Sequence, residues 1–332
     1  MRSLKNKETI DNLVKSANAK KKLFTAGPAS LLPENLTGII PCFGRGDVEY
    51  QKLEDKVLIS LKSMSKHTKI ARMQGSGSLA LEIVATNFLH GNVLIISSGY
   101  YSERLEYLAN SVSKNFGTIK NVDIMTFEEA QAKKTKFDWI WACSTETSVG
   151  VKNSIKDLKT IARISGASLA LDATASFGLE EGHELADVIS YSSCKGLFGL
   201  TGACFIAYNE TPKSDVPSFY LNLENHVNKK MTGPYHAIAS LSDVLPIHET
   251  LKKTVQINKL EFMKKMNAFL TQPPERQPLL CTHVSVSVKA KTDDVILYQP
   301  RNNLGGSIVC HIGEVHTKET CKADILESLE VI

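Results

Sequence analysis

The segment ASLALD, at residues 167–172, is a short apolar run that ends in a carboxylate, and it decides the fold class. Similar apolar runs recur on both sides of it, with helix-like segments between them. We expect strands at 93–98, 137–143, 167–171, 186–193 and 203–207, and helices at 79–90, 102–113 and 154–165. Short strands separated by helices need crossover connections. The sequence therefore predicts an α/β fold with a mainly parallel sheet covered on both faces.

The chain has 332 residues, which suggests about two domains. Residues 1–22 are rich in lysine and are expected to form an N-terminal helix or tail. Residues 23–233 carry the alternating strands and helices of a large domain. From Pro234 a long helical stretch is expected to reach about residue 270, and strands at 284–289 and 307–312 and a helix at 318–330 follow. Residues 234–332 thus predict a connecting helix and a small α+β C-terminal domain.

Composition excludes several classes of function. The formal net charge of +4 is too small to indicate binding to nucleic acid or to a membrane surface. No apolar run is long enough for a transmembrane helix, and the N-terminus lacks the apolar centre of a secretory signal. The seven cysteines are scattered without a Cys-x-x-Cys pair, which favours reduced thiols in a cytoplasmic protein and no metal site.

The segment Gln74-Gly75-Ser76-Gly77-Ser78 stands directly before a predicted helix. Its glycines allow close approach to the backbone, and the helix N-terminus offers unpaired N–H groups. The two serines add hydroxyl donors. Such a loop suits a phosphate group, although by itself it could be only a helix cap.

Asp172 and Lys195 each follow an apolar strand, and 23 residues separate them. The carboxyl ends of parallel strands meet at one edge of a sheet, where ligands bind in this class of fold. A carboxylate there can bind a cationic heterocycle, and a partly buried lysine can attack a carbonyl. Taken singly, each could be an ordinary loop residue. With the phosphate loop they supply the three requirements of pyridoxal 5'-phosphate: a phosphate anchor, an anion beside the ring nitrogen and a lysine for the Schiff base.

The order and spacing of several short motifs resemble the class V aminotransferases, which are fold-type I pyridoxal-phosphate enzymes. The motifs are residues 24–28 (FTAGP), 74–78 (QGSGS), 98–101 (SGYY), 145–147 (TET), 172–178 (DATASFG), 193–195 (SCK), 232–234 (TGP) and 312–314 (IGE). The chain looks most like the 2-aminoethylphosphonate–pyruvate transaminases, from about residue 23 to the C-terminus. The resemblance implies a large cofactor-binding domain with a seven-stranded type of sheet, and a homodimer with shared active sites.

The resemblance also implies roles for individual residues. The phosphate of the cofactor would be held by Ser76, Gly77 and Ser78, and by Thr232 of the neighbouring subunit. Tyr101 would stack on the cofactor ring, and Thr147 would bind its oxygen or the adjoining site. Asp172 would pair with the ring nitrogen. Lys195 would bind the cofactor covalently and act as the catalytic base. Gly27 would border the substrate pocket.

One departure from the family concerns the substrate. The family binds the α-carboxylate with an arginine four positions before Ile-Gly-Glu, where this chain has Ile308. Arg45 and Arg301 are the substitutes that the sequence offers, and either could instead be a solvated surface residue. The resemblance implies amino transfer from a small anionic primary amine, similar to 2-aminoethylphosphonate, to a keto acid such as pyruvate. A pyridoxal-phosphate-dependent lyase or decarboxylase, or a non-catalytic member of the fold, remains an alternative.

Overall fold

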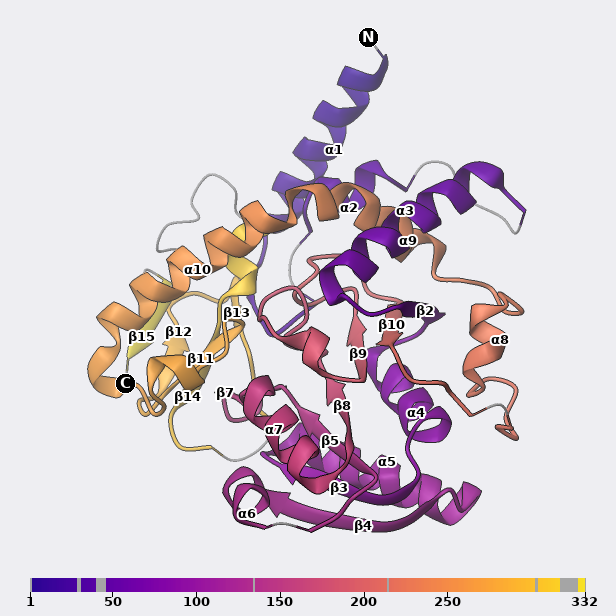
Figure 1. Ribbon diagram of the computed structural model, residues 1–332. Coiled ribbons are helices and arrows are strands. Elements are labelled where there is room, and N and C mark those ends of the chain that lie inside the picture. Colours follow the sequence, from indigo (N-terminus) through magenta and orange to yellow (C-terminus); the bar gives the residue numbers. More distant parts are fainter. Residues whose placement is uncertain are drawn as a thin grey trace.

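A seven-stranded sheet forms the centre of the computed structural model (Figure 1), which describes residues 2–28, 31–39, 46–133, 135–213, 215–301, 304–316 and 328–331. In spatial order the strands are β2 (Lys69–Gln74), β10 (Ala203–Tyr208), β9 (Val188–Ser192), β8 (Ser168–Asp172), β5 (Trp139–Cys143), β3 (Gly91–Ser97) and β4 (Ile119–Thr126). Only β10 runs antiparallel to its neighbours in this sheet. The predicted α/β fold with a mainly parallel sheet is confirmed.

Strand residues alternate between two apolar cores, as a sheet covered on both faces requires. In β3, Leu94 and Ile96 belong to one cluster of buried side chains, and Val93 and Ile95 to the other. The first cluster is completed by α3 (Val48–Ser65), α6 (Phe127–Ala132), α7 (Ile155–Ser165) and α9 (Tyr235–Val244). The second is completed by α4 (Gly77–Asn87), α5 (Tyr100–Phe116) and Leu223 of α8 (Leu223–Val227).

The C-terminal part forms a smaller body beside the sheet (Figure 1). Its two-stranded pairs are β11 (Cys281–Val284) with β14 (Ser307–Cys310), and β12 (Val288–Ala290) with β15 (Leu329–Val331). Strand β13 (Val295–Leu297) pairs in parallel with β1 (Lys22–Phe24) from the beginning of the chain. Helix α10 (His248–Lys265) and the 3-10 helix η5 (Ile312–His316) pack against these strands. The remaining short elements are α2 (Glu34–Thr37), β6 (Thr145–Glu146), β7 (Val151–Lys152), η1 (His183–Leu185), η3 (Asn267–Phe269) and η4 (Pro274–Arg276).

Three expectations for this part differ from the structure. The strand expected at 284–289 is interrupted: β11 ends at Val284, a bend follows at residues 285–286, and β12 begins at Val288. The single long helix expected from Pro234 is divided into α9 and α10 by the 3-10 turn η2 (Leu245–Ile247). Pro246 lies in that turn, and its ring and missing N–H group are incompatible with a continuous helix. Of the helix expected at 318–330, residues 318–327 lie outside the described residues, and residues 329–331 form β15 instead. The N-terminal helix expected in 1–22 is present as α1 (Arg2–Asn18), which projects from the body in Figure 1.

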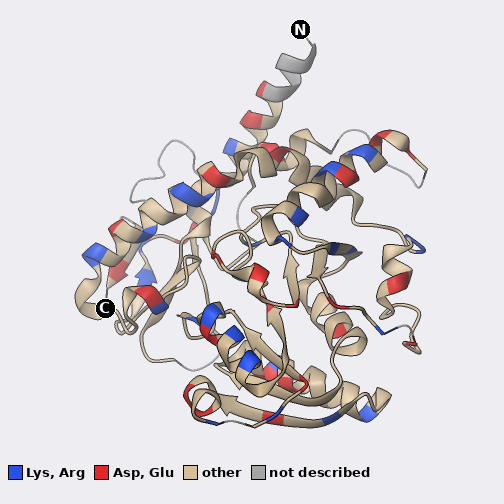
Figure 2. Cartoon of the chain, viewed as in Figure 1, with Lys and Arg blue, Asp and Glu red and all other residues tan. Residues whose placement is uncertain are grey.

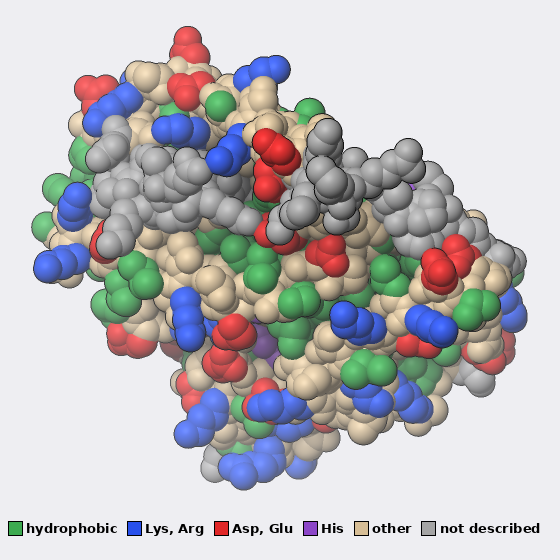
Figure 3. Space-filling model, turned by 90° about the horizontal axis from the view of Figure 1, so that it is seen from above, with side chains coloured by type: hydrophobic (Ala, Val, Ile, Leu, Met, Phe, Trp, Pro, Cys, Tyr) green, Lys and Arg blue, Asp and Glu red, His purple; other side chains and the backbone are tan. Residues whose placement is uncertain are grey.

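Charged side chains of both signs are intermixed over the chain and on the face seen in Figure 3 (Figures 2 and 3). This distribution agrees with the small net charge. None of the helices in the described ranges combines the length and the apolar character that crossing a bilayer would demand.

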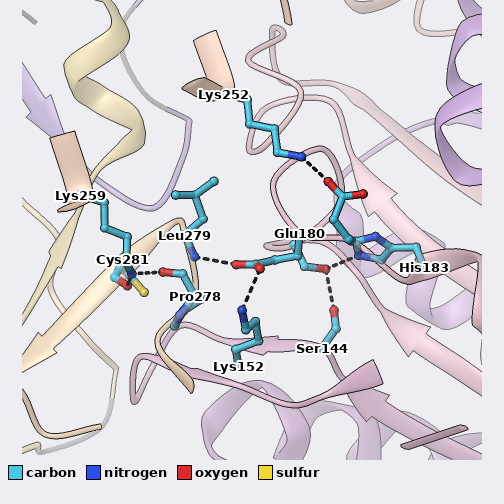
Figure 4. A network of polar contacts seen from close by, with 11 residues as sticks. Ser144, Lys152, Glu180, His183, Lys252, Lys259, Pro278, Leu279 and Cys281 are labelled. Atoms are coloured by element: carbon cyan, nitrogen blue, oxygen red, sulfur yellow. Dashed lines mark hydrogen bonds and ion pairs between the residues drawn. The ribbon is translucent and has the colours of Figure 1, made fainter. Parts of the chain in front are cut away.

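A polar network joins the sheet domain to the C-terminal part (Figure 4). The Glu180 carboxylate accepts hydrogen bonds from Lys152 Nζ at 3.1 Å and from the backbone N–H of Leu279 at 2.6 Å. In the C-terminal part, the ammonium of Lys259 donates to the carbonyl oxygens of Pro278 and Cys281. Burial lowers the pKa of Lys259 to about 8. The network fixes the loop 277–281, which leads into β11, against both α10 and the sheet domain.

Candidate active site

A cavity of about 380 Å³ lies beyond the carboxyl ends of β8 and β9, the place where open α/β sheets bind ligands. Its lining includes these predicted site residues: Gly27, Ser76, Gly77, Ser78, Tyr101, Thr147, Asp172, Lys195 and Arg301. Residues from both ends of the chain therefore meet at one edge of the sheet. A larger groove of about 730 Å³ lies between α7 and η4. We place the candidate site in the smaller cavity because a lysine, a strand-end carboxylate and an open helix N-terminus converge there.

Lys195 lies in the loop after β9, and its side chain crosses to the N-terminal segment. Lys195 Nζ donates to the carbonyl oxygen of Ala26 at 3.1 Å and is 3.5 Å from that of Gly27. Gly27 has a φ of +102°, and a Cβ atom there would lie 2.6 Å from the carbonyl oxygen of Cys194. Only glycine permits this close approach. The amine is thus held at the cavity by backbone oxygens.

Asp172 is the last residue of β8, and its carboxylate is buried. One carboxylate oxygen accepts from the backbone N–H of Thr174 at 2.9 Å, and the other lies 3.7 Å from the thiol of Cys143. Burial raises the pKa of the Cys143 thiol, and the charge on Asp172 raises it further. The thiol therefore stays neutral at pH 7.

A chain of hydroxyl groups supports Asp172 from behind. The Ser144 hydroxyl donates to the Asp172 carbonyl oxygen at 3.0 Å and lies 2.6 Å from the Ser176 hydroxyl, which is 2.8 Å from Nε2 of His183. Burial lowers the pKa of His183 to about 4, so its ring is neutral at pH 7. Buried polar networks of this kind restrict the backbone to one arrangement.

Helix α4 opens toward the cavity. Ser76 is its N-cap, and the Ser76 side chain makes no capping hydrogen bond to the helix. A Cβ atom on Gly77 would lie only 3.0 Å from the Thr174 hydroxyl oxygen. That hydroxyl is buried and has no hydrogen-bond partner among the described residues. First-turn N–H groups, an uncommitted serine and an unpaired hydroxyl together form an anion cradle.

Helix α5 brings an aromatic side chain to the same cavity. The backbone N–H groups of Tyr101 and Ser102 each donate to the Glu146 carboxylate at 3.1 Å. Burial raises the pKa of Glu146 above its usual value. Glu146 thus occupies the N-terminus of α5 and sets the direction in which Tyr101 enters the cavity. The motif TET contains Glu146, but its role could not be read without knowing where α5 begins.

Arg104 also lines the cavity and was not among the residues singled out from the sequence. It lies one helical turn after Tyr101, and its Nη1 donates to the Ser78 hydroxyl at 3.0 Å. The helix predicted from the sequence began at residue 102, one position too late to include Tyr101. In α5, which begins at Tyr100, residues three positions apart such as Tyr101 and Arg104 lie on the same face.

Three further residues from the sequence analysis are Arg45, Thr232 and Ile308. Arg45 lies outside the described residues. Thr232 is exposed and does not line the cavity within its own chain. Ile308 is buried in an apolar cluster and faces away from solvent. The resemblance implies an arginine at this position, and the chain has a core residue there instead.

The chain is similar in sequence to proteins that are named as transaminases. No family model matches the chain. A bifunctional phosphonoacetaldehyde hydrolase/aminoethylphosphonate transaminase from Clostridioides difficile is 27% identical over 253 residues, which cover 67% of this chain but only 39% of that protein. A 2-aminoethylphosphonate–pyruvate transaminase from Pseudomonas putida (strain W619) is 24% identical over 247 residues, covering 67% of each chain.

Solved structures share the fold at low identity. The pyridoxamine–pyruvate aminotransferase of Mesorhizobium loti superposes with a TM-score of 0.76 at 18% identity and covers 89% of this chain and 87% of its own. An alanine–glyoxylate aminotransferase from Nostoc sp. has the same TM-score at 17% identity, covering 91% and 92%. The resemblance found in the sequence is confirmed: the chain has the fold of fold-type I aminotransferases and is similar in sequence to 2-aminoethylphosphonate–pyruvate transaminases.

Proposed function

We propose that this protein is a pyridoxal-phosphate-dependent aminotransferase. It would move an amino group between a small anionic primary amine, similar to 2-aminoethylphosphonate, and a keto acid such as pyruvate. The observation that carries the proposal is the convergence of Lys195, Asp172 and the N-terminus of α4 on one cavity. Each of the three meets a different requirement of the cofactor, and the similar curated proteins are transaminases by name.

The residues present fit the cofactor. Ser76, Gly77 and Ser78 would hold its phosphate at the anion cradle, where the unpaired Thr174 hydroxyl is also available. Tyr101 would stack on the ring, and Thr147, which is buried in the lining, would bind the ring oxygen or the adjoining site. When bound, the cofactor supplies an electron sink for the bond that breaks at the substrate carbon.

Two side chains would carry the chemistry. The carboxylate of Asp172 would hold a proton on the ring nitrogen, and its buried position makes that charge–charge contact strong. Lys195 Nζ would bind the cofactor covalently in the resting enzyme. Once displaced by the donor amine, Lys195 Nζ would move a proton at the substrate carbon as the general base. Its present acceptors, the carbonyl oxygens of Ala26 and Gly27, would hold the free amine nearby.

The substrate would enter beside Gly27 and Arg301, both of which line the cavity. Arg45 is proposed as a further substrate-binding residue from the sequence alone. We also propose a division into an N-terminal helix (1–22), a large cofactor-binding domain (23–233) and a connecting helix with a small domain (234–332), to which β1 adds a strand.

We further propose a homodimer with shared active sites, in which Thr232 reaches the cofactor phosphate of the neighbouring subunit. The segment before Thr232 exposes large apolar side chains, namely Phe219, Tyr220 and Val227. Exposed apolar residues gathered on one segment are typical of an interface. A cytoplasmic location is proposed as well, since the five cysteines described are free thiols.

A lyase or decarboxylase is the second candidate, and the burial of Ile308 favours it. Without the family's arginine at that position, the α-carboxylate of a keto acid or amino acid lacks its usual partner. A non-catalytic member of the fold would be expected to lose the lysine or the aspartate, and both are present.

A donor–acceptor screen tests the proposal. The protein is incubated with pyridoxal phosphate, single small amines and single keto acids, and products are identified by mass spectrometry. We expect the nitrogen of an isotopically labelled amine in the amino acid formed from the keto acid. Loss of carbon dioxide or cleavage of the donor without nitrogen transfer would replace the aminotransferase with a lyase. Absence of any reaction, together with failure to bind the cofactor, would contradict both.

A further inference from the structure

Two arginine side chains surround the hydroxyl group of Tyr100 at the mouth of the candidate site. Arg301 Nη1 lies 3.4 Å from the Tyr100 hydroxyl, and the Arg301 guanidinium carbon is 5.4 Å from the centre of the Tyr100 ring. The Arg104 guanidinium carbon lies 5.8 Å from the same ring and 5.2 Å from the ring of Tyr101. Both arginines line the cavity. The two tyrosine rings pack edge to face and support the guanidinium groups.

Among the described residues, neither guanidinium group is paired with a carboxylate. Within the described ranges, no carboxylate lies within 4.0 Å of Arg104 or Arg301, whereas the buried Arg72 is paired with Glu54. The nearest acidic residue along α5, Glu103, is exposed, and Glu146 is committed to the N–H groups of α5. Hydrogen bonds from Arg301 and then from Arg104 lower the pKa of Tyr100, as expected when both groups face its hydroxyl.

We propose that Arg104 and Arg301, with the Tyr100 hydroxyl between them, bind the anionic group at the far end of the amine substrate. The inference rests on the proposed aminotransferase function and specifies its substrate class. Two uncompensated positive charges and a neutral donor suit a doubly charged tetrahedral group, such as a phosphonate, better than a carboxylate, which one guanidinium group can hold alone.

The position of Ile308 supports this assignment. The described part of the cavity lining contains no other arginine, and Ile308 is packed in a core. Within the described lining, the guanidinium groups available to an anion therefore come from α5 and from the loop after β13. The rival role for Arg104 is the cofactor phosphate, because its Nη1 also donates to the Ser78 hydroxyl. Measurements of cofactor affinity distinguish the two roles.

The experiment uses Arg104→Gln, Arg301→Gln and the double variant, with Arg276→Gln as the control. Arg276 is a partly exposed arginine in the other groove. The cofactor-loaded enzymes are compared with three donors of similar length: 2-aminoethylphosphonate, 3-aminopropanoate and propylamine. We expect each single variant to lower kcat/KM for the phosphonate about 10- to 100-fold, the loss of one charged hydrogen-bonding partner. The effect should be smaller for the carboxylate and absent for propylamine and for Arg276→Gln.

A binding measurement separates this inference from the proposed function. Methylphosphonate is titrated calorimetrically into the cofactor-loaded proteins, in which the phosphate cradle is already filled. Binding to the wild type and to Arg276→Gln, with loss in the double variant, would support the anion site even if no donor reacts. Equal losses of kcat/KM for all three donors would overturn the inference. So would a weaker affinity for pyridoxal phosphate with an unchanged donor preference, which would assign Arg104 to the cofactor.

Discussion

Lys195 Nζ donates a hydrogen bond of 3.1 Å to the carbonyl oxygen of Ala26, a residue 169 positions earlier in the chain. The group proposed to react is therefore positioned by the backbone of the N-terminal segment. Among the described residues, no carboxylate lies within 4.0 Å of this amine. Its surroundings leave it free to exchange its protein contacts for a covalent bond to the cofactor.

Replacing Lys195 by alanine should abolish amino transfer while the protein remains folded, because the partly buried Lys195 side chain lies at the cavity and its amine contacts backbone oxygens there. Proton transfer alone accounts for about 10²- to 10⁴-fold in rate. The visible absorbance band of the lysine-bound cofactor should also disappear. Lys195→Arg is the matched control, since it keeps the charge but cannot form the bond. Turnover within tenfold of the wild type in either variant would remove Lys195 from the mechanism.

Gly27→Ala should lower both stability and activity. The new Cβ would lie 2.6 Å from the carbonyl oxygen of Cys194, and a φ of +102° is unfavourable for alanine. We expect a loss of about 1–3 kcal/mol in the free energy of unfolding and a displaced Lys195. Gly117→Ala separates the two causes, because Gly117 also has a positive φ, of +66°, but no described atom lies within 4 Å of its Cβ position. A Gly27→Ala protein as active as Gly117→Ala would show that the contact with Cys194 is dispensable.

The free energy of unfolding should decrease in acid because of Glu54. Burial alone would raise the pKa of its carboxyl group, but Lys229 and Arg72 outweigh burial and hold that pKa below its usual value of 4.5. A lowered folded-state pKa gives stability that is present above pH 4.5 and is lost as the pH falls through the folded-state value.

Glu54→Gln should therefore cost about 3–5 kcal/mol near pH 7, since it leaves the buried Arg72 unpaired. The difference in Tm between the variant and the wild type should shrink below pH 4. A constant difference from pH 7 to pH 3 would contradict the ionised state of Glu54.

Two neighbouring glutamates should differ sharply in their contribution to stability. Glu180 is mostly buried and accepts from Lys152 and from the backbone N–H of Leu279, so Glu180→Gln should cost about 1–3 kcal/mol. Glu181 pairs with Lys252 but is 87% exposed, and Glu181→Gln should cost at most about 1 kcal/mol. Urea unfolding of both variants checks this. Equal effects would mean that the Glu180 network does not hold the two parts of the molecule together.

The inner strands of the central sheet were predicted from the sequence, because buried parallel strands consist of continuous apolar residues. The runs at 137–143 and 203–207 fall within a few residues of β5 and β10. Both edge strands, β2 and β4, were missed because polar or charged residues, such as Arg72 in β2 and Asn121 and Asp123 in β4, interrupt the apolar pattern. The break at Pro246 was also overlooked, although proline is the strongest local signal against a continuous helix.

The sequence could predict which residues meet in the candidate site only where those residues directly follow strands. Asp172, Lys195 and the loop 74–78 all lie at strand ends, so their convergence follows from the topology. Arg104 and Glu146 could not be placed in this way. Their roles depend on where α5 begins and on how its first turn meets β6, which no short motif specifies.

Strand β1 determines whether the C-terminal part can be produced as a separate fragment. It forms a parallel ladder with β13, and Phe24 is packed in the C-terminal cluster with Phe262 and Leu329. A fragment expressed from residue 234 onward would expose that cluster and one edge of β13. Such a fragment should be insoluble alone and should be rescued by a peptide spanning residues 19–28 supplied in trans.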